Sequence, residues 1–445
     1  MEEISSITLN IGGKAETAAK AIYIESYGCA ANKADLEIML AHIVNAGYKI
    51  INRIEDADII MINTCGVKKP TEDRMLGRIR FFNGLNKPLI IAGCLPKINF
   101  EAVTKAAPNF SAMLDPYSID KILLALKAAE SGERNKIFFS EKPIVKPAQP
   151  KIRLNRVIEI IPISEGCLGV CTYCCVRFAR GRLFSYPKEL IVDRIKSAII
   201  DGAKEIWLTS QDNGAYGADI GTNFVELLKE CSSLEGKFLI RVGMMNPNHV
   251  IKMLPELIET YKNERIFKFL HIPVQSGDND VLKMMNRKYT VEEFKSIVES
   301  FRREIPEITI ATDIICGFPG ESRESFERTL QLIEDVKPDI INISKFFPRP
   351  NTPAARMKQL DSREVAVRSR VATDLVSRIS LKMNMRWIGW EGEILVDEKG
   401  PGDSWIGRNY AYKPIVVRSQ KNLLGEFINV KVTEAHVNYL EAEII

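Results

Sequence analysis

Three closely spaced cysteines near the middle of the chain have the pattern of metal ligands. Cys167, Cys171 and Cys174 form a Cys-x3-Cys-x2-Cys motif in the segment EGCLGVCTYCCVRFARGR, directly after an apolar segment with the pattern of a β-strand. Three thiolates on one short loop hold three irons of a four-iron cube, whereas a complete set of ligands has four. The fourth iron keeps an open position, which is what a reactive metal site needs. The spacing predicts a catalytic iron–sulfur site.

Other interpretations of this motif fit the residues less well. Cys175 is a possible fourth ligand, but it is adjacent to Cys174, and neighbouring side chains on an extended turn point apart. A structural zinc site usually combines two Cys-x2-Cys pairs or includes histidine. The chain has no second pair of this kind, and its four histidines lie far from the motif in sequence. A chance group of three buried cysteines is the remaining alternative.

Three further cysteines each follow a predicted strand. Cys29 ends the segment IYIESYGC, Cys65 ends DIIMINTC and Cys94 ends PLIIAGC, and each lies beside a glycine. Residues just past the carboxyl ends of parallel strands gather at one crevice of an open α/β sheet. We therefore expect these cysteines to form a second metal-binding triplet. Cys231, in a predicted helix, and Cys316, in a predicted buried strand, are interpreted as core thiols.

The order of predicted elements indicates an α/β chain with distinct parts. In residues 20–138, apolar strands alternate with helices over 35–46 and 73–85, which favours a Rossmann-like parallel sheet. Residues 139–155 are rich in Pro and Lys and resemble a linker. Residues 156–382 alternate as in a partial (β/α)6 barrel, whose chemistry lies at the C-terminal strand ends. Residues 383–445 contain four predicted short strands and resemble a small all-β nucleic-acid-binding barrel. The six predicted strands of the partial barrel are 157–163, 205–209, 238–243, 267–273, 309–316 and 340–346.

Composition and charge narrow the class of protein only in part. The 445 residues allow two or three domains, and 61 Lys+Arg against 57 Asp+Glu give a net charge of +4. This mild excess permits an anionic partner such as RNA but fits a solvated surface of mixed sign equally well. The sequence shows no signal-peptide pattern and no apolar run long enough to span a bilayer. We expect a cytoplasmic protein, in which nine cysteines serve as ligands, catalytic groups or core residues rather than disulfides.

The motifs together resemble the radical S-adenosylmethionine (SAM) superfamily and, within it, the methylthiotransferase branch. The resemblance covers nearly the whole chain: an N-terminal methylthiotransferase domain, a radical SAM domain and a C-terminal TRAM domain. It implies two [4Fe-4S] clusters, one on each cysteine triplet, and S-adenosyl-L-methionine as cofactor. The segments that carry it are SYGCAANKADLEIM, INTCGV, IAGCLP, ARGRLFSYP, LTSQDNGAYG, HIPVQSGDNDVLKMMNRKYT and TDIICGFPGES.

Within this branch, the segments SYGCAANKAD, CCVRFARGRLFSY and VGMMNPNH are similar to the archaeal and eukaryotic type. That similarity implies addition of a methylthio group to C2 of N6-threonylcarbamoyladenosine at position 37 of tRNA. One SAM molecule would methylate a sulfur at the N-terminal triplet, and another would yield the radical that removes hydrogen from C2. Bacterial relatives that act on isopentenylated adenosine usually have an Asn-rich radical loop and a proline after the residue matching Val176. This chain has Leu168-Gly169-Val170 and Arg177 instead.

Residues at the ends of other barrel strands are candidates for contact with SAM. Each of them is also explained as a polar or turn residue that completes its own loop, and His271 is either a site residue or a core histidine. The candidates are Ser210, Gln211 and Asp212 after the second strand, Gln275 and Ser276 after the fourth, and Gly317, Phe318, Pro319 and Gly320 after the fifth.

Basic and aromatic residues near the cysteine loop and in the small barrel are candidates for RNA contact. The same residues also fit solvated charges and barrel core. We expect tRNA, an electron donor and a sulfur donor as partners of a monomer, and neither DNA nor a membrane. The main candidates are Arg177, Arg180, Arg182, Arg408 and Lys413, with Lys142, Lys146, Lys151, Arg153 and Arg156 in the linker.

Alternative functions remain open at this point. A methylthiotransferase acting on isopentenyladenosine tRNA or on a ribosomal-protein side chain would have the same cysteine triplets. A non-enzymatic metal-bearing RNA-binding protein would bind metal without cleaving SAM. A radical enzyme that only methylates would hold iron at one triplet rather than two.

Overall fold

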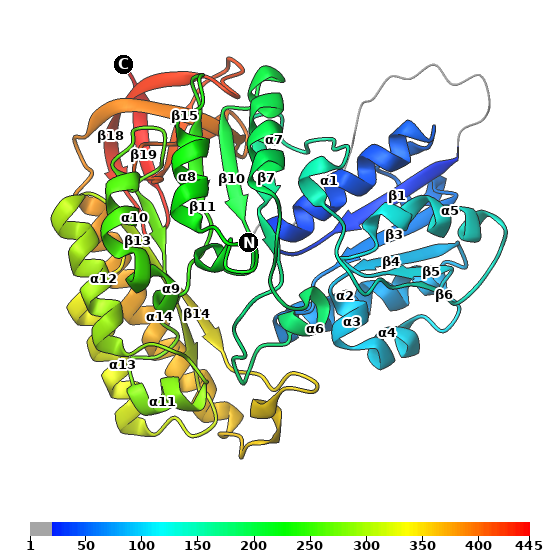
Figure 1. The fold of residues 1–445 in the computed structure, drawn as a ribbon, viewed down its shortest axis with the longest axis horizontal. Coiled ribbons are helices and arrows are strands. Elements are labelled where there is room, and N and C mark those ends of the chain that lie inside the picture. Colours follow the sequence, from blue (N-terminus) through cyan, green and yellow to red (C-terminus); the bar gives the residue numbers. More distant parts are fainter. Residues whose placement is uncertain (1–19) are drawn as a thin grey trace.

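The structure is a computed structural model and describes residues 20–445. Figure 1 shows a first α/β part, in blue and cyan, beside a second part, in green and yellow, with a small β-barrel in red at one end of the second part. The predicted fold class is confirmed, because both larger parts contain parallel sheets and the C-terminal strands close into a barrel.

The first part is a six-stranded parallel sheet in the order β2-β1-β3-β4-β5-β6, covered on both faces. Its central strands β3 and β4 are buried along their whole length and mostly apolar, as expected for strands covered on both sides. Helices α1 (Ala30–Asn45) and α5 (Ile122–Glu130) pack on one face, and α2 (Lys69–Gly84), α3 (Leu95–Ile98) and α4 (Phe100–Ala106) pack on the other. The strands are β1 (Ala21–Ser26), β2 (Lys49–Ile51), β3 (Ile59–Thr64), β4 (Leu89–Gly93), β5 (Ala112–Leu114) and β6 (Lys136–Phe138).

The second part contains all six strands predicted for a partial barrel, in two three-stranded parallel sheets. A parallel bridge between Ile240 and Ile266 joins the sheets, so that the strands run in chain order around an open half-barrel. The strands are β7 (Ile158–Pro162), β10 (Glu205–Thr209), β11 (Leu239–Val242), β12 (Phe269–His271), β13 (Thr309–Cys316) and β14 (Ile340–Lys345). Besides the short helix α6 (Val176–Arg180), the helices of this part are α7 (Lys188–Ile200), α8 (Phe224–Ser232), α9 (Pro247–Val250), α10 (Leu254–Tyr261), α11 (Asn279–Met284), α12 (Val291–Glu304), α13 (Arg323–Val336) and α14 (Ser362–Met385).

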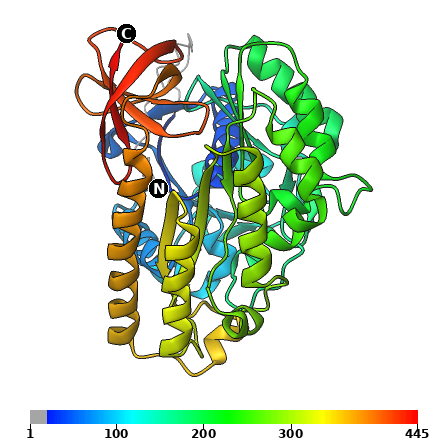
Figure 2. The same cartoon turned by 90° about the vertical axis from the view of Figure 1, so that its left-hand side faces the viewer.

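The C-terminal part is a closed barrel in the order β15-β16-β17-β19-β18, which follows the long helix α14 directly (Figure 2). Four of its strands were predicted. The fifth, β16, was missed because the turn residues Gly400, Pro401 and Gly402 directly before it masked a short strand. The strands are β15 (Glu391–Lys399), β16 (Ser404–Arg408), β17 (Pro414–Arg418), β18 (Phe427–Ala435) and β19 (Leu440–Ile444).

The segment 139–155, predicted as a linker, is packed between the two α/β parts. Lys146 is buried and bonds to Asp35 of α1 at 2.5 Å and to Glu165. Lys151 likewise joins Glu37 of α1 to Glu159 of β7, at 2.9 and 3.0 Å. These two lysines therefore hold the first and second sheets together, and their expected contact with RNA is wrong because their charges are already satisfied inside the molecule.

No helix within residues 20–445 is both long and apolar enough to cross a membrane.

Candidate active site

The loop with Cys167, Cys171 and Cys174 is enclosed by a short antiparallel ladder. Strands β8 (Ser164–Glu165) and β9 (Phe184–Ser185) pair on either side of it, and α6 (Val176–Arg180) closes it. Gly166 starts the loop at a φ of 72°, where an added Cβ would lie 2.0 Å from the carbonyl oxygen of Arg182. Only glycine fits this approach. The backbone N–H of Gly169 donates to Cys167 Sγ at 3.2 Å, as backbone donors do around metal-bound thiolates.

The second triplet lies at the carboxyl ends of three adjacent strands, as predicted. Cys29 follows β1 and caps α1, Cys65 follows β3, and Cys94 follows β4. Asn32 fixes this end of the sheet, since its side chain donates to the Thr64 carbonyl at 2.8 Å and lies 3.4 Å from Cys94 Sγ. Parallel pairing of these strands therefore places the three cysteines around one crevice.

Both triplets face the same cavity, which has a volume of about 390 Å³. The first sheet supplies one wall and the C-terminal ends of the half-barrel strands supply the other. Several predicted SAM or RNA contacts also line it, as does His271. The lining includes Cys29, Cys65, Cys94, Cys167, Cys171, Cys174, Ser210, Gln211, Gln275, Arg177, Arg180 and Arg287.

The electrostatics of the two triplets suit a bound cation. Burial, followed by the neighbouring charges of Cys29 and Cys94, raises the pKa of Cys65 to about 12. Burial likewise raises the pKa of Cys174 to about 12, with Cys171 as the next largest cause. Buried thiols that raise each other's pKa lose their protons only when a metal compensates the charge. The residues present therefore fit an iron–sulfur cluster on each triplet.

The spacing of the thiols argues against a single ion at either triplet. Tetrahedral zinc with Zn–S bonds of about 2.3 Å brings its sulfurs to roughly 3.8 Å from one another. Among residues 20–445, one group of three candidate ligands has all its atoms within 4.8 Å, and this group contains no cysteine. A four-iron cube spreads its thiolate ligands more widely than one ion does.

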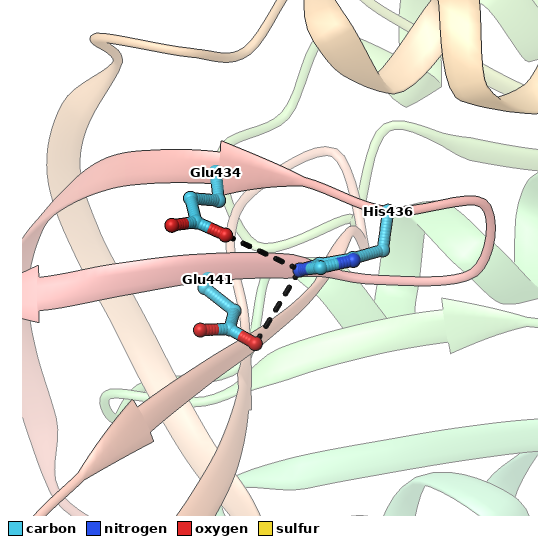
Figure 3. Close-up of side chains that lie close together, drawn as sticks. All are labelled: Glu434, His436 and Glu441. Atoms are coloured by element: carbon cyan, nitrogen blue, oxygen red, sulfur yellow. Dashed lines mark ion pairs between the residues drawn. The ribbon is translucent and has the colours of Figure 1, made fainter.

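That one close group consists of Glu434 and His436, at the end of β18, and Glu441 on β19 (Figure 3). The His436 Nε2 atom lies 3.3 Å from Glu441 and 3.8 Å from Glu434. These are ordinary ion-pair distances on the partly exposed surface of the small barrel, outside the cysteine cavity.

Three of the predicted SAM contacts line the cavity, and one lies beside it. Gln211 accepts a hydrogen bond from the Gly166 N–H at 2.7 Å and so links the second barrel strand to the cysteine loop. Ser210 and Gln275 also face the cavity. Asp212 is buried, accepts hydrogen bonds from the backbone and side chain of Asn246 at 3.0 and 2.6 Å, and lines a smaller adjacent cavity of about 120 Å³.

The other five predicted contacts do not line the cavity. Ser276 is buried with its hydroxyl 3.4 Å from that of Thr329, and Phe318 packs edge-on between Tyr173 and Phe346 in the core. The side chains of Ser276 and Phe318 therefore pack in the interior and do not face the cavity. The five residues are Ser276, Gly317, Phe318, Pro319 and Gly320.

The structure also revises the predicted RNA contacts. Arg180 is 1% exposed and pairs with Asp35 at 2.7 Å and Glu165 at 3.1 Å, so its charge is satisfied inside the molecule and is not available to an RNA backbone. Lys413 is 2% exposed and pairs with Asp339 at 2.8 Å, so the same correction applies.

Of the remaining predicted RNA contacts, one already has an ion-pair partner and two lie at or near the cysteine cavity. Arg408 is largely committed to Asp397 at 3.1 Å. Arg177 lines the cysteine cavity, and Arg182 is exposed just beyond it. Contact of Arg177 and Arg182 with RNA stays a prediction.

Arg287 is a site residue that the sequence prediction did not single out. Its guanidinium donates to Cys171 Sγ at 3.2 Å and contacts Asn246. A cation beside a ligand sulfur stabilises the thiolate. The segment MMNRKYT contains this arginine, but nothing in its local pattern distinguishes it from a surface arginine, because its partner lies 116 residues away.

Comparison with sequence families agrees with the order of the three parts. The family described as "Radical SAM superfamily" matches residues 161–333, "Uncharacterized protein family UPF0004" matches 21–115 and "TRAM domain" matches 386–445. The half-barrel with its cysteine loop is thus a radical SAM domain. Solved structures agree at the level of fold. The radical S-adenosylmethionine methyltransferase TsrM from Kitasatospora setae has a TM-score of 0.56 at 14% identity, over 76% of this chain and 77% of that chain.

Curated relatives resemble the chain over almost its full length. A protein from Pyrococcus horikoshii, named "Probable threonylcarbamoyladenosine tRNA methylthiotransferase", is 45% identical over 95% of this chain and 99% of its own. The Homo sapiens protein named "Threonylcarbamoyladenosine tRNA methylthiotransferase" is 36% identical over 95% of this chain and 73% of its own. This chain belongs to the threonylcarbamoyladenosine tRNA methylthiotransferase family.

Proposed function

We propose that this protein adds a methylthio group to C2 of N6-threonylcarbamoyladenosine at position 37 of tRNA. In this proposal it uses S-adenosyl-L-methionine and two [4Fe-4S] clusters, one on each cysteine triplet. The single observation that carries the proposal is the convergence of six thiols, three from each α/β part, on one cavity of about 390 Å³. A base held there would lie against both triplets at once, and such positioning supplies a large part of catalysis.

The residues around the cavity have distinct roles in this proposal. When bound, the cluster on Cys167, Cys171 and Cys174, together with SAM, supplies a radical that activates a C–H bond. The chain itself holds the geometry. Gln211 fixes the start of the cysteine loop, and Arg287 donates to Cys171 Sγ. The cavity lies between the two sheets, and a base bound there would displace water from the reacting atoms.

The choice of tRNA as substrate rests on the names of the curated relatives and on the C-terminal TRAM domain. Arg177 and Arg182 supply positive charge near the cavity for an RNA backbone. The reaction also needs an electron donor and a sulfur donor. We expect it to take place in the cytoplasm.

Iron counting after anaerobic purification tests the two-cluster proposal. We expect about eight irons per chain, and about four in either Cys29→Ala or Cys167→Ala, since each triplet ligates one four-iron cube. Cys231→Ala is the matched control, because this buried thiol lies in α8, away from the cavity, and its removal leaves the iron content unchanged. Zinc in place of iron, or four irons in the wild type, would contradict the proposal.

Nucleoside analysis then tests the substrate. We expect tRNA from cells that express the protein to contain 2-methylthio-N6-threonylcarbamoyladenosine, and cells that express Cys167→Ala to lack it. Methylthiolated isopentenyladenosine, or a methylthiolated ribosomal protein, would support the rival substrates. Failure to form 5′-deoxyadenosine from SAM and reductant would favour a metal-bearing RNA-binding protein without enzymatic activity.

A further inference from the structure

A second cavity, of about 600 Å³, adjoins the cysteine cavity. The two cavities share part of their walls, including Tyr173, Cys174 and Gln275. The second cavity lies between the segment 67–70, which follows Cys65 in the first sheet, and the C-terminal ends of β13 and β14. When a base is held at the cysteine triplets, a substituent of that base therefore has room to extend into the second cavity.

Two exposed lysines stand on opposite walls of this second cavity. Lys68 comes from the first α/β part, and Lys345 is the last residue of β14 in the radical SAM domain. Neither has an ion-pair partner among residues 20–445. The other basic residues of the lining differ in this respect, since Lys69 pairs with Asp73 and Arg349 with Glu72. Lys68 and Lys345 are thus the cations that an incoming anion would meet.

The one carboxylate in the lining, Asp313, is already compensated. It accepts hydrogen bonds from His271 at 3.1 Å and from Asn342 at 2.8 Å. Burial acts to raise the pKa of Asp313, but these two partners and the charge of Lys68 lower it overall. Lys68 is therefore close enough to act on groups inside the cavity, and the cavity has a net positive wall.

We propose that Lys68 and Lys345 bind the carboxylate of the threonylcarbamoyl group and thereby select this substituent over an uncharged one. The inference rests on the proposed function and deepens it. The C2 atom and the N6 substituent belong to the same six-membered ring of adenine. When C2 faces the cysteine triplets, the substituent points into the neighbouring space.

The same geometry disfavours a prenyl substituent. An isopentenyl group in this cavity would displace water from two ammonium groups and offer no charge or hydrogen bond in return. The threonylcarbamoyl group offers a carboxylate to them, and charge-assisted hydrogen bonds of this type are stronger than neutral ones. Discrimination therefore comes both from attraction to one substituent and from the desolvation that the other imposes.

Binding of three RNAs to iron-loaded protein tests this inference. The RNAs are anticodon stem–loops that differ only in the base at position 37: N6-threonylcarbamoyladenosine, adenosine or N6-isopentenyladenosine. We expect Lys68→Met and Lys345→Met each to weaken binding of the first RNA about tenfold, as expected for loss of a hydrogen bond to a charged group. Binding of the other two RNAs is expected to change less than twofold. Lys69→Met, in the same loop, is the matched control and leaves all three affinities unchanged, because Lys69 is already paired.

The RNA backbone is the other source of an anion at this place. Equal loss of affinity for all three RNAs would show that the lysines contact phosphate, and no loss for any of them would show that they contact neither. Either result would overturn the inference. Iron is counted in each preparation, so that failure of the proposed function, seen as wild-type protein without two clusters, is distinguished from failure of the lysine contacts.

Discussion

Arg180 joins the two cysteine triplets through contacts that reach both sheets. Its guanidinium bonds to Asn32 at 2.6 Å and Asp35 at 2.7 Å, both on the helix that Cys29 caps. It also bonds to Glu165 at 3.1 Å, two residues before Cys167. Lys146 contacts the same two carboxylates, so two cations compensate two anions in a region that excludes water.

Removal of this guanidinium leaves buried carboxylates with one cation between them. We expect Arg180→Met to lower the free energy of unfolding by about 3–5 kcal/mol, the usual cost of breaking a buried ion pair from one side. Chemical denaturation of anaerobically purified protein measures the change.

Arg182→Met is the control for this substitution. Arg182 is exposed two residues further along, and its loss is expected to change the free energy of unfolding by less than about 0.5 kcal/mol. If Arg180→Met has the stability of the wild type but binds RNA more weakly, Arg180 contacts RNA and does not stabilise the buried ion network.

At the scale of elements, the segment 139–155 fixes one sheet against the other. Beyond the lysine pairs, its backbone bonds to α1: the Ile152 N–H donates to the Glu37 carbonyl at 3.0 Å, and the Leu154 N–H donates to the Glu37 carboxylate at 2.9 Å. Burial raises the pKa of Glu37, and the charge of Lys151 opposes that rise. Lys151, which lies between Glu37 and Glu159, therefore helps to fix the C-terminal end of this segment.

Lys151→Met should loosen this segment without unfolding the sheets. We expect amide exchange at Leu154 to accelerate roughly tenfold, because Glu37 loses its charged partner and holds the Leu154 N–H less firmly. Hydrogen–deuterium exchange with mass spectrometry over residues 151–156 measures it. Lys142→Met, a change at an exposed residue of the same segment, is the control. Equal exchange in both variants would mean that the segment does not depend on the lysine pair.

The main elements followed from local sequence patterns, whereas their mutual packing did not. Strands β1, β3 and β4 are mostly apolar and each is closely followed by a cysteine, and their shared direction was enough to predict the N-terminal triplet. The helix predicted from residue 35 begins earlier, at Ala30, with Cys29 at its N-cap position. The short strands β2, β5 and β6 were not predicted, since three residues give too little periodicity.

The cysteine ligands of the site could be predicted from the sequence, whereas the cavity around them could not. Chain order places each cysteine triplet at strand ends, but nothing local indicates that both triplets share one cavity. That arrangement depends on contacts such as Arg180 with Asp35, which are 145 residues apart. Arg180 and Lys413 were predicted as RNA contacts because they are basic. Their ion-pair partners lie in distant segments of the chain and keep both side chains inside the molecule.

At the scale of the whole molecule, the small barrel is bound to the radical SAM domain through buried polar groups. The Tyr412 hydroxyl donates to Glu205 of β10 at 3.1 Å, and the Lys268 N–H donates to the Tyr410 carbonyl at 2.7 Å. Lys413 pairs with Asp339 across the same boundary. The barrel in Figure 2 is therefore held in one orientation relative to the half-barrel, which any RNA that contacts both must match.

This boundary also contains a carboxylate that titrates near neutral pH. Burial raises the pKa of Asp397 to about 8; Arg408 opposes the rise and the nearby charge of Glu205 adds to it. In the unfolded chain an aspartate has a pKa of about 3.9. Between pH of about 4 and about 8, Asp397 is therefore protonated in the folded state and ionised in the unfolded state. The stability that this proton contributes is complete below pH of about 4 and is lost as the pH rises through about 8.

We expect the free energy of unfolding to fall between pH 5 and 8 more steeply in the wild type than in Asp397→Asn, by up to about 1.4 kcal/mol per pH unit. The neutral amide takes the place of the protonated carboxyl and does not titrate. Lys268, whose pKa burial lowers to about 8, begins to titrate at the upper end of this window with the opposite effect on stability, but both proteins contain it, so it does not alter the difference between them. Asp374→Asn, on the exposed side of α14, should keep the wild-type slope. Parallel curves for wild type and Asp397→Asn would show that Asp397 is ionised throughout, and that Arg408, rather than a shared proton, stabilises the boundary.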